Sequence, residues 1–153
     1  MQYCVSVLAF LLTLLSTAPA LATQCNVTAT PVNFGAYDPL STVPTDATGT
    51  IDVSCRTPSQ RPQTVTLQLS AGGSGNFGQR TMTSAAGDTL LYNLYSDPSM
   101  STVFGDGSGG SATLTKTVYR GAPWSVTIYG RIPALQKVPV GTYTDVLTAT
   151  ILW

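Results

Sequence analysis

The sequence predicts an all-β fold, an immunoglobulin-like β-sandwich, and three observations support this expectation. The chain of 153 residues contains 14 Gly and 10 Pro, is rich in Ser and Thr, and has no Glu. Such a composition favours strands and turns over helices. Apolar and polar side chains alternate along several segments with the two-residue period of half-buried strands. Clusters of Gly, Pro, Ser and Asp separate these segments, as in sandwiches of six or seven short strands. A small barrel is the alternative.

The N-terminal segment differs in kind from the rest of the chain. Residues 5–15 are almost wholly apolar, and Ala20 and Ala22 give the small-x-small pattern after which signal peptidases cut. No Lys or Arg precedes the apolar run, which is too short to cross a bilayer comfortably. We therefore expect residues 1–22 to be an export signal, with a short core-forming segment as the alternative. Residues 23–153 are long enough for one domain with a real core.

Cysteine usage supports export. Removal of the signal would leave Cys25 and Cys55, and an even pair in an exported chain indicates a disulfide. Each cysteine falls on the apolar side of an alternating segment, residues 25–30 and residues 50–55. We expect a buried bridge that joins the first two strands and stabilises the fold by about 3–4 kcal/mol on the chain-entropy model. Two free thiols are the alternative.

Further strands are expected along the rest of the chain, with Gly-rich and Pro-containing turns between them. They are residues 64–70, 90–95, 112–119, 125–129 and 142–153. We find no internal repeat, linker or second domain. Residues 105–110 carry five glycine and serine residues around Asp106, which would suit a cation or phosphate loop. An EF-hand loop needs several acidic ligands and a terminal Glu, so a hairpin tip is the better interpretation.

The chemistry-bearing residues point away from catalysis. The sequence contains no His, which removes the commonest general base and the commonest metal ligand. Seven Lys and Arg balance seven Asp and Glu, and no stretch concentrates one sign, as a nucleic-acid-binding surface would. We therefore expect no enzyme, no catalytic residue, no metal, no cofactor and no nucleic-acid partner.

Six aromatic residues invite a ligand hypothesis. They are Tyr92, Tyr95, Tyr119, Trp124, Tyr129 and Tyr143. Such residues serve either as packing partners across strands or as a face for sugar binding, and we expect packing for most of them. A carbohydrate-binding module stays as an alternative function.

The C-terminal segment alternates once more. Its apolar side consists of Leu147, Ala149, Ile151 and Trp153. The pattern alone fits two structures equally well: an ordinary closing strand in a complete sandwich, or the edge of an open groove in a sandwich that lacks its final strand.

Five motifs in order along the chain bear a family resemblance. They are VNFGAY at residues 32–37, GTIDVSC at 49–55, LYNLYSD at 91–97, YGRIPALQ at 129–136 and GTYTD at 141–145. Together they extend over nearly all of residues 25–153. The sequence resembles the spore coat protein U domain family, which is similar to subunits of archaic chaperone–usher pili.

The resemblance implies a fold and a mode of assembly. It implies an immunoglobulin-like sandwich without its final strand, whose groove takes a strand from a periplasmic pilus chaperone and later one from a neighbouring subunit. The partners would be this chaperone, an outer-membrane usher and other subunits, with the alternating side chains of residues 147–153 forming the chaperone and donor-strand groove. The protein would pass through the periplasm to a fimbrium on the cell surface, or be secreted.

The segment before the first cysteine refines this expectation. Only Thr23 and Gln24 would precede Cys25 after cleavage, which is too short for a donor strand at about 3.3 Å per residue. The protein is thus expected to receive a donor strand rather than supply one. This favours a minor or tip-located subunit, acting in surface attachment and biofilm formation. A self-contained secreted or coat structural protein is the alternative.

Overall fold

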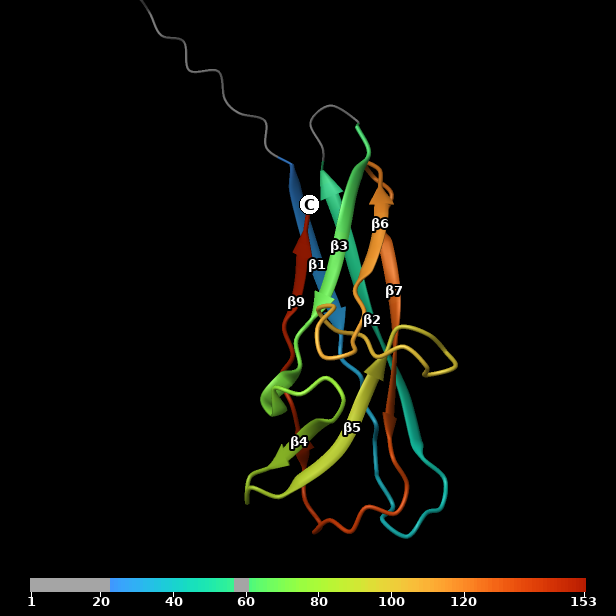
Figure 1. Cartoon of the computed structure of the whole chain (residues 1–153), viewed down its shortest axis with the longest axis vertical. Helices are drawn as coiled ribbons and strands as arrows, with labels where there is room; N and C mark the ends of the chain where they lie inside the picture. Colours follow the sequence, from blue (N-terminus) through green and yellow to red (C-terminus); the bar gives the residue numbers. More distant parts are fainter. Residues whose placement is uncertain (1–22, 57–60) are drawn as a thin grey trace, which may run out of the picture.

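The architecture is an all-β sandwich, seen in a computed structural model that describes residues 23–56 and 61–153 (Figure 1). Its strands are β1 (Gln24–Thr30), β2 (Thr45–Arg56), β3 (Gln63–Leu69), β4 (Arg80–Ser84), β5 (Thr89–Tyr95), β6 (Leu114–Val118), β7 (Trp124–Ile132), β8 (Tyr143–Thr144) and β9 (Ala149–Leu152). A 3-10 turn, η1 (Gly72–Ser74), follows β3. The predicted export signal, residues 1–22, lies outside the described part of the chain.

Two antiparallel sheets form the layers. The larger sheet has the strand order β1-β2-β7-β5-β4-β8, and the smaller has the order β6-β3-β9. Strands distant in sequence therefore become neighbours: β2 pairs with β7 from Thr45–Ile132 to Val53–Trp124. The predicted immunoglobulin-like sandwich is confirmed.

The core lies between the inner faces of the two sheets. Val53 of β2, Val65 and Leu67 of β3 and Phe104 are completely buried. Along β7, every second residue from Trp124 to Ile132 is buried, and the residues between them are exposed or half-buried. The alternation in the sequence thus predicted which side chains face inward, because successive side chains of a strand point to opposite faces.

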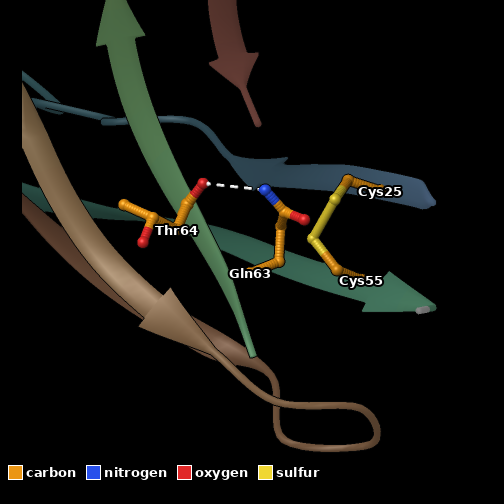
Figure 2. Close-up of a disulfide and its surroundings, with 4 residues drawn as sticks. All are labelled: Cys25, Cys55, Gln63 and Thr64. Carbon is orange, nitrogen blue, oxygen red and sulfur yellow. Dashed lines mark hydrogen bonds between the residues drawn. A yellow bond between two sulfur atoms is a disulfide. The ribbon is translucent and has the colours of Figure 1, made fainter. Parts of the chain in front are cut away.

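The predicted disulfide is present. Cys25 of β1 and Cys55 of β2 lie directly opposite each other in the ladder and are joined by a bridge (Figure 2). Cys55 is buried and Cys25 is half-buried, on the core side of the two strands. Gln63 at the start of β3 lies in the surroundings of the bridge, where its side-chain amide donates to the carbonyl of Thr64 (3.4 Å). The bridge therefore ties the edge strand β1 to the body of the larger sheet.

Two expectations about strands need correction. The segment 80–84 was not predicted as a strand, yet it forms β4, with Arg80 and Met82 buried. The segment 142–153 was expected to be one strand but consists of β8 and β9, which belong to different sheets. The interruption lies at residues 145–148, because the Asp145 side chain bonds to groups outside the strand, as described below.

Candidate functional site

The described residues form an apolar groove of about 960 Å³. The segment 29–37, which continues from the end of β1, contributes one part of its lining. The C-terminal segment 138–149 contributes another. Core side chains such as Leu90, Leu94 and Ile128 complete the lining, so the groove gives access to the hydrophobic core itself.

The segment 31–37 lies against the larger sheet at two glycines. A Cβ at Gly49 would lie 2.7 Å from the carbonyl oxygen of Thr30 and 3.0 Å from the backbone nitrogen of Val32. A Cβ at Gly130 would lie 2.7 Å from Cζ of Phe34. Both positions therefore require glycine for close packing rather than for a special φ.

Phe34 fixes this part of the groove further. Its ring meets Tyr92 of β5 edge-on, with ring centroids 6.0 Å apart, an arrangement favoured by aromatic pairs. Beyond it, the Tyr37 hydroxyl donates to the carbonyl of Pro133 (3.0 Å) and accepts from the backbone N–H of Gln136 (2.7 Å). The segment is therefore held in place although it belongs to no strand ladder.

The C-terminal side of the groove connects both sheets. β8 pairs with β4 of the larger sheet, and β9 pairs with β3 of the smaller one. Between them, the Asp145 carboxylate accepts hydrogen bonds from the Tyr92 hydroxyl (2.6 Å), Gly73 N–H (2.9 Å) and Val146 N–H (2.8 Å). Burial, and then the hydrogen bond to Asp145, raise the pKa of Tyr92 well above its usual value.

Two strand edges face each other beside the groove. β1 ends the larger sheet and β9 ends the smaller one, and the two strands approach each other (Figure 1). In the part of the chain that the structure describes, β1 pairs only with β2, and β9 pairs only with β3. The facing edges thus present backbone N–H and C=O groups that belong to no ladder, a feature that favours pairing with a further strand.

The four C-terminal residues predicted to form the groove are not equivalent. Leu147 and Ala149 line it. Ile151 packs against the core further along β9. Trp153 is 54% exposed and lines a separate hollow of about 650 Å³ together with Cys25 and other residues near the disulfide.

The six aromatic residues do not form one binding face. Tyr92 and Trp124 are buried in the core, as expected for packing partners. Tyr95 and Tyr129 are cross-strand neighbours in β5 and β7, and both are half-buried. Tyr119 is exposed.

The glycine-rich loop is a turn held by its own side chains. The Asp106 carboxylate accepts from the backbone N–H (2.8 Å) and hydroxyl (2.7 Å) of Ser108, and these bonds lower its pKa. Nowhere in residues 23–56 and 61–153 do three His, Cys, Asp or Glu side chains gather as a metal site requires. The hairpin expectation needs correction: the loop is a turn, but the flanking residues Phe104 and Ala112 form a parallel bridge rather than the antiparallel pair of a hairpin.

One buried charge, the guanidinium of Arg80, is not indicated by the sequence. Arg80 is fully buried, and its guanidinium donates to Asn93 Oδ1 (2.7 Å) and to the carbonyls of Ser70 (2.9 Å) and Phe104 (2.7 Å). The guanidinium also lies 5.2 Å from the ring of Phe77. Burial lowers the pKa of Arg80. An arginine ahead of a short polar run carries no sign of burial in the sequence, because its acceptors come from three distant segments.

The fold and the groove define a class of protein: an immunoglobulin-like sandwich with an accessible core between two strand edges. The chain belongs to the Spore Coat Protein U domain family, whose model matches residues 11–150. A relative in this family is Protein U of Myxococcus xanthus, 37% identical over 128 residues that cover 78% of this chain and 70% of the relative.

A solved structure has a similar fold. It is the crystal structure of the CsuC–CsuE chaperone–tip adhesion subunit pre-assembly complex from archaic chaperone–usher Csu pili of Acinetobacter baumannii. The TM-score is 0.57 with 19% sequence identity, over 86% of this chain and 40% of the solved chain. This chain therefore spans less than half of that chain's length, and the likeness is one of fold.

Proposed function

We propose that the protein is a non-enzymatic subunit of an archaic chaperone–usher type of pilus, minor or tip-located, that acts in surface attachment and biofilm formation. The observation that carries this proposal is the apolar groove beside the facing edges of β1 and β9. An added strand supplies main-chain hydrogen bonds to such an edge, while its alternate side chains enter the groove. Its first occupant is a strand of a periplasmic chaperone, and its second is a strand of a neighbouring subunit delivered at an outer-membrane usher.

A groove of this kind leaves apolar side chains exposed to water unless a further strand covers it. Leu147, Ala149, Val32 and Phe34 are only half-buried although they pack against the core. Covering their remaining apolar surface stabilises the protein by about 25 cal/mol for each Å² removed from water. The same surface, left open, promotes aggregation. Both effects favour a protein that is chaperoned until it is assembled.

Attachment is supported by the end of the sandwich opposite the C-terminus. Leu40 (84% exposed), Val43 (67%), Leu135 (58%) and Val140 (107%) project from two loops there. The loops meet because Thr45 pairs with Ile132 at the ends of β2 and β7, and Figure 1 shows them at the foot of the molecule. Exposed apolar clusters mark interaction surfaces. The tip adhesion subunit in the similar solved complex agrees with such a position.

Export is part of the proposal. The disulfide agrees with an oxidising compartment, and residues 1–22 are proposed to be the signal that directs the chain there. The described residues contain no helix that is long and apolar enough to cross a bilayer.

Peptide binding tests the groove. Ten-residue peptides that alternate apolar residues with Thr, Ser or Lys match the length from β8 to β9, and their affinity is measured by fluorescence anisotropy. We expect micromolar binding by the best peptides and no binding by permuted peptides of the same composition that lack alternation. Equal binding of permuted peptides, or none by any peptide, would refute strand addition.

A self-contained coat or secreted protein is the second candidate, and the description of the family, Spore Coat Protein U domain, favours it. Co-expression with an archaic pilus chaperone separates the two functions. A one-to-one complex supports the pilus subunit. A soluble, protease-resistant monomer obtained without any chaperone supports the coat protein.

A further inference from the structure

The C-terminal segment changes sheets within a few residues. Tyr143 and Thr144 pair with β4 of the larger sheet, whereas the strand from Ala149 onward pairs with β3 of the smaller one. Pairing with the continuation of β3 resumes at Thr148, whose carbonyl accepts from Ser70 N–H (2.9 Å). Residues 145–147 therefore cross between the layers without a ladder of their own, and Asp145 and Leu147 line the groove at this crossing.

Asp145 holds the crossing by joining three separate parts of the structure. Its Oδ2 accepts from the Tyr92 hydroxyl of β5, and its Oδ1 accepts from Gly73 N–H of η1 and from Val146 N–H of the crossing itself. A Cβ at Gly72 would collide with this carboxylate, so the turn packs directly against it. Hydrogen bonds to a charged acceptor are about twice as strong as neutral ones.

The surroundings make the carboxylate difficult to replace by water. Tyr92 is 4% exposed, so its hydroxyl depends on Asp145 for a partner inside the protein. The nearby Arg80 is completely buried, and the charge of Asp145 acts on it as a counter-charge that partly offsets the effect of burial on its pKa. The carboxylate thus has partners in the core, in η1 and in the crossing segment itself.

We propose that Asp145 is a positioning residue for strand docking: it fixes where the C-terminal segment leaves the larger sheet, and thereby the place of β9 and of the groove beside it. This inference rests on the proposed function, because docking at β9 is what the position would serve. Without the carboxylate, residues 145–148 lose their attachment to β5 and η1. The edge of β9 then stays bonded to β3 but is no longer held at a constant distance from segment 31–37.

Peptide affinity in the wild type and two variants tests this role. The tightest-binding alternating peptide is titrated against the full chain, against Asp145→Ala and against Asp145→Asn. We expect at least 10-fold weaker binding by Asp145→Ala. Asp145→Asn keeps an acceptor for Gly73 and Val146 and an amide for Tyr92, so it should stay within 3-fold of the wild type. If Asp145→Ala does not fold, Tyr92→Phe removes one of the three donors and should weaken binding about 3-fold.

Asp97→Ala is the matched control. The Asp97 carboxylate also accepts several hydrogen bonds, from Ser99, Ser101 and Thr102, in a loop that does not line the groove. We expect Asp97→Ala to lower the midpoint of guanidinium unfolding without changing peptide affinity. An equal loss of affinity in Asp97→Ala and Asp145→Ala would reduce the effect to general destabilisation and overturn the proposal.

Amide hydrogen exchange in the free chain gives a second measurement that needs no peptide. Asp145→Ala should raise the exchange rates of the amides of residues 146–148 at least 10-fold and leave those of β2 and β7 unchanged; unchanged rates throughout would overturn the positioning role. The failures are distinguishable. No peptide binding by the wild type refutes the proposed function and, with it, the docking role. Equal binding by the wild type and Asp145→Ala refutes the docking role alone.

Discussion

Replacing Gly49 by alanine tests the packing on which the groove depends. The new Cβ would lie 2.7 Å from the carbonyl oxygen of Thr30, so the backbone after β1 must move by about 0.7 Å to restore an ordinary contact. Overpacking of this kind costs about 1–3 kcal/mol. Alanine also restricts the unfolded chain, which offsets about 0.4–1 kcal/mol. We therefore expect a net loss of about 1–2 kcal/mol in the free energy of unfolding.

Thermal unfolding followed by circular dichroism measures this loss. For a domain of this size, 1 kcal/mol corresponds to about 3–5 °C, so Gly49→Ala should lower Tm by about 3–10 °C. Since the displaced segment lines the groove, binding of an apolar dye such as anilinonaphthalene sulfonate should also increase.

Gly141→Ala is the matched control. A Cβ there meets only Tyr143 and Ser84 at 3.8 and 3.9 Å, which are ordinary contacts, and its φ is not in the left-handed region. Its Tm should equal or slightly exceed that of the wild type. If Gly49→Ala melted at or above the wild-type temperature, the close approach of the segment after β1 to β2 would not exist as described.

Four further perturbations have expected outcomes. Cys55→Ser opens a bridge between residues 30 apart and should cost about 3–4 kcal/mol in guanidinium unfolding; an unchanged midpoint would contradict its stabilising role. Ile151→Asp places a charge on the half-buried side of β9 and should abolish peptide or chaperone capture, whereas normal capture would exclude β9 as the docking edge. Arg80→Ala removes three hydrogen bonds, two of them buried, and should cost at least about 3 kcal/mol; a loss below about 1 kcal/mol would show that water replaces the guanidinium. Burial and Asp145 raise the pKa of Tyr92, so the native state holds the phenol proton more tightly than the unfolded chain does. This stabilisation is complete below pH of about 10 and is lost as the pH rises further, so Tyr92→Phe should unfold with a shallower alkaline dependence between about pH 10 and 12.

Much of the strand structure could be predicted because it depends on local pattern. The alternation at residues 51–55 and 64–70 reappears as buried Ile51, Val53 and Cys55 in β2 and buried Val65, Leu67 and Leu69 in β3. The pattern is local, because a strand that buries one face must have an inward-facing apolar side chain at every second position. β4 escaped prediction because Arg80 looks like a surface residue until its three acceptors are known.

The candidate site was predicted in part. Leu147 and Ala149 line the groove that the family resemblance implied, although their alternation alone fitted an ordinary closing strand equally well, whereas Trp153 lies at the disulfide end of the molecule. Half-buried and exposed residues also alternate without a break through Asp145–Leu147, although these residues belong to no strand ladder. A period of two cannot tell which sheet a strand belongs to, since both sheets bury one face in the same way.

The all-β class, the inward faces of the strands and the pairing of Cys25 with Cys55 could be predicted from the amino-acid sequence alone. These depend on side-chain period, composition and cysteine number. Three features became visible only in the folded molecule: the C-terminal segment crosses between the sheets at Asp145, Arg80 is buried, and Gly49 leaves room for the segment that lines the groove. Each of those features consists of contacts between segments far apart in the chain, and such contacts exist only once the sheets have packed.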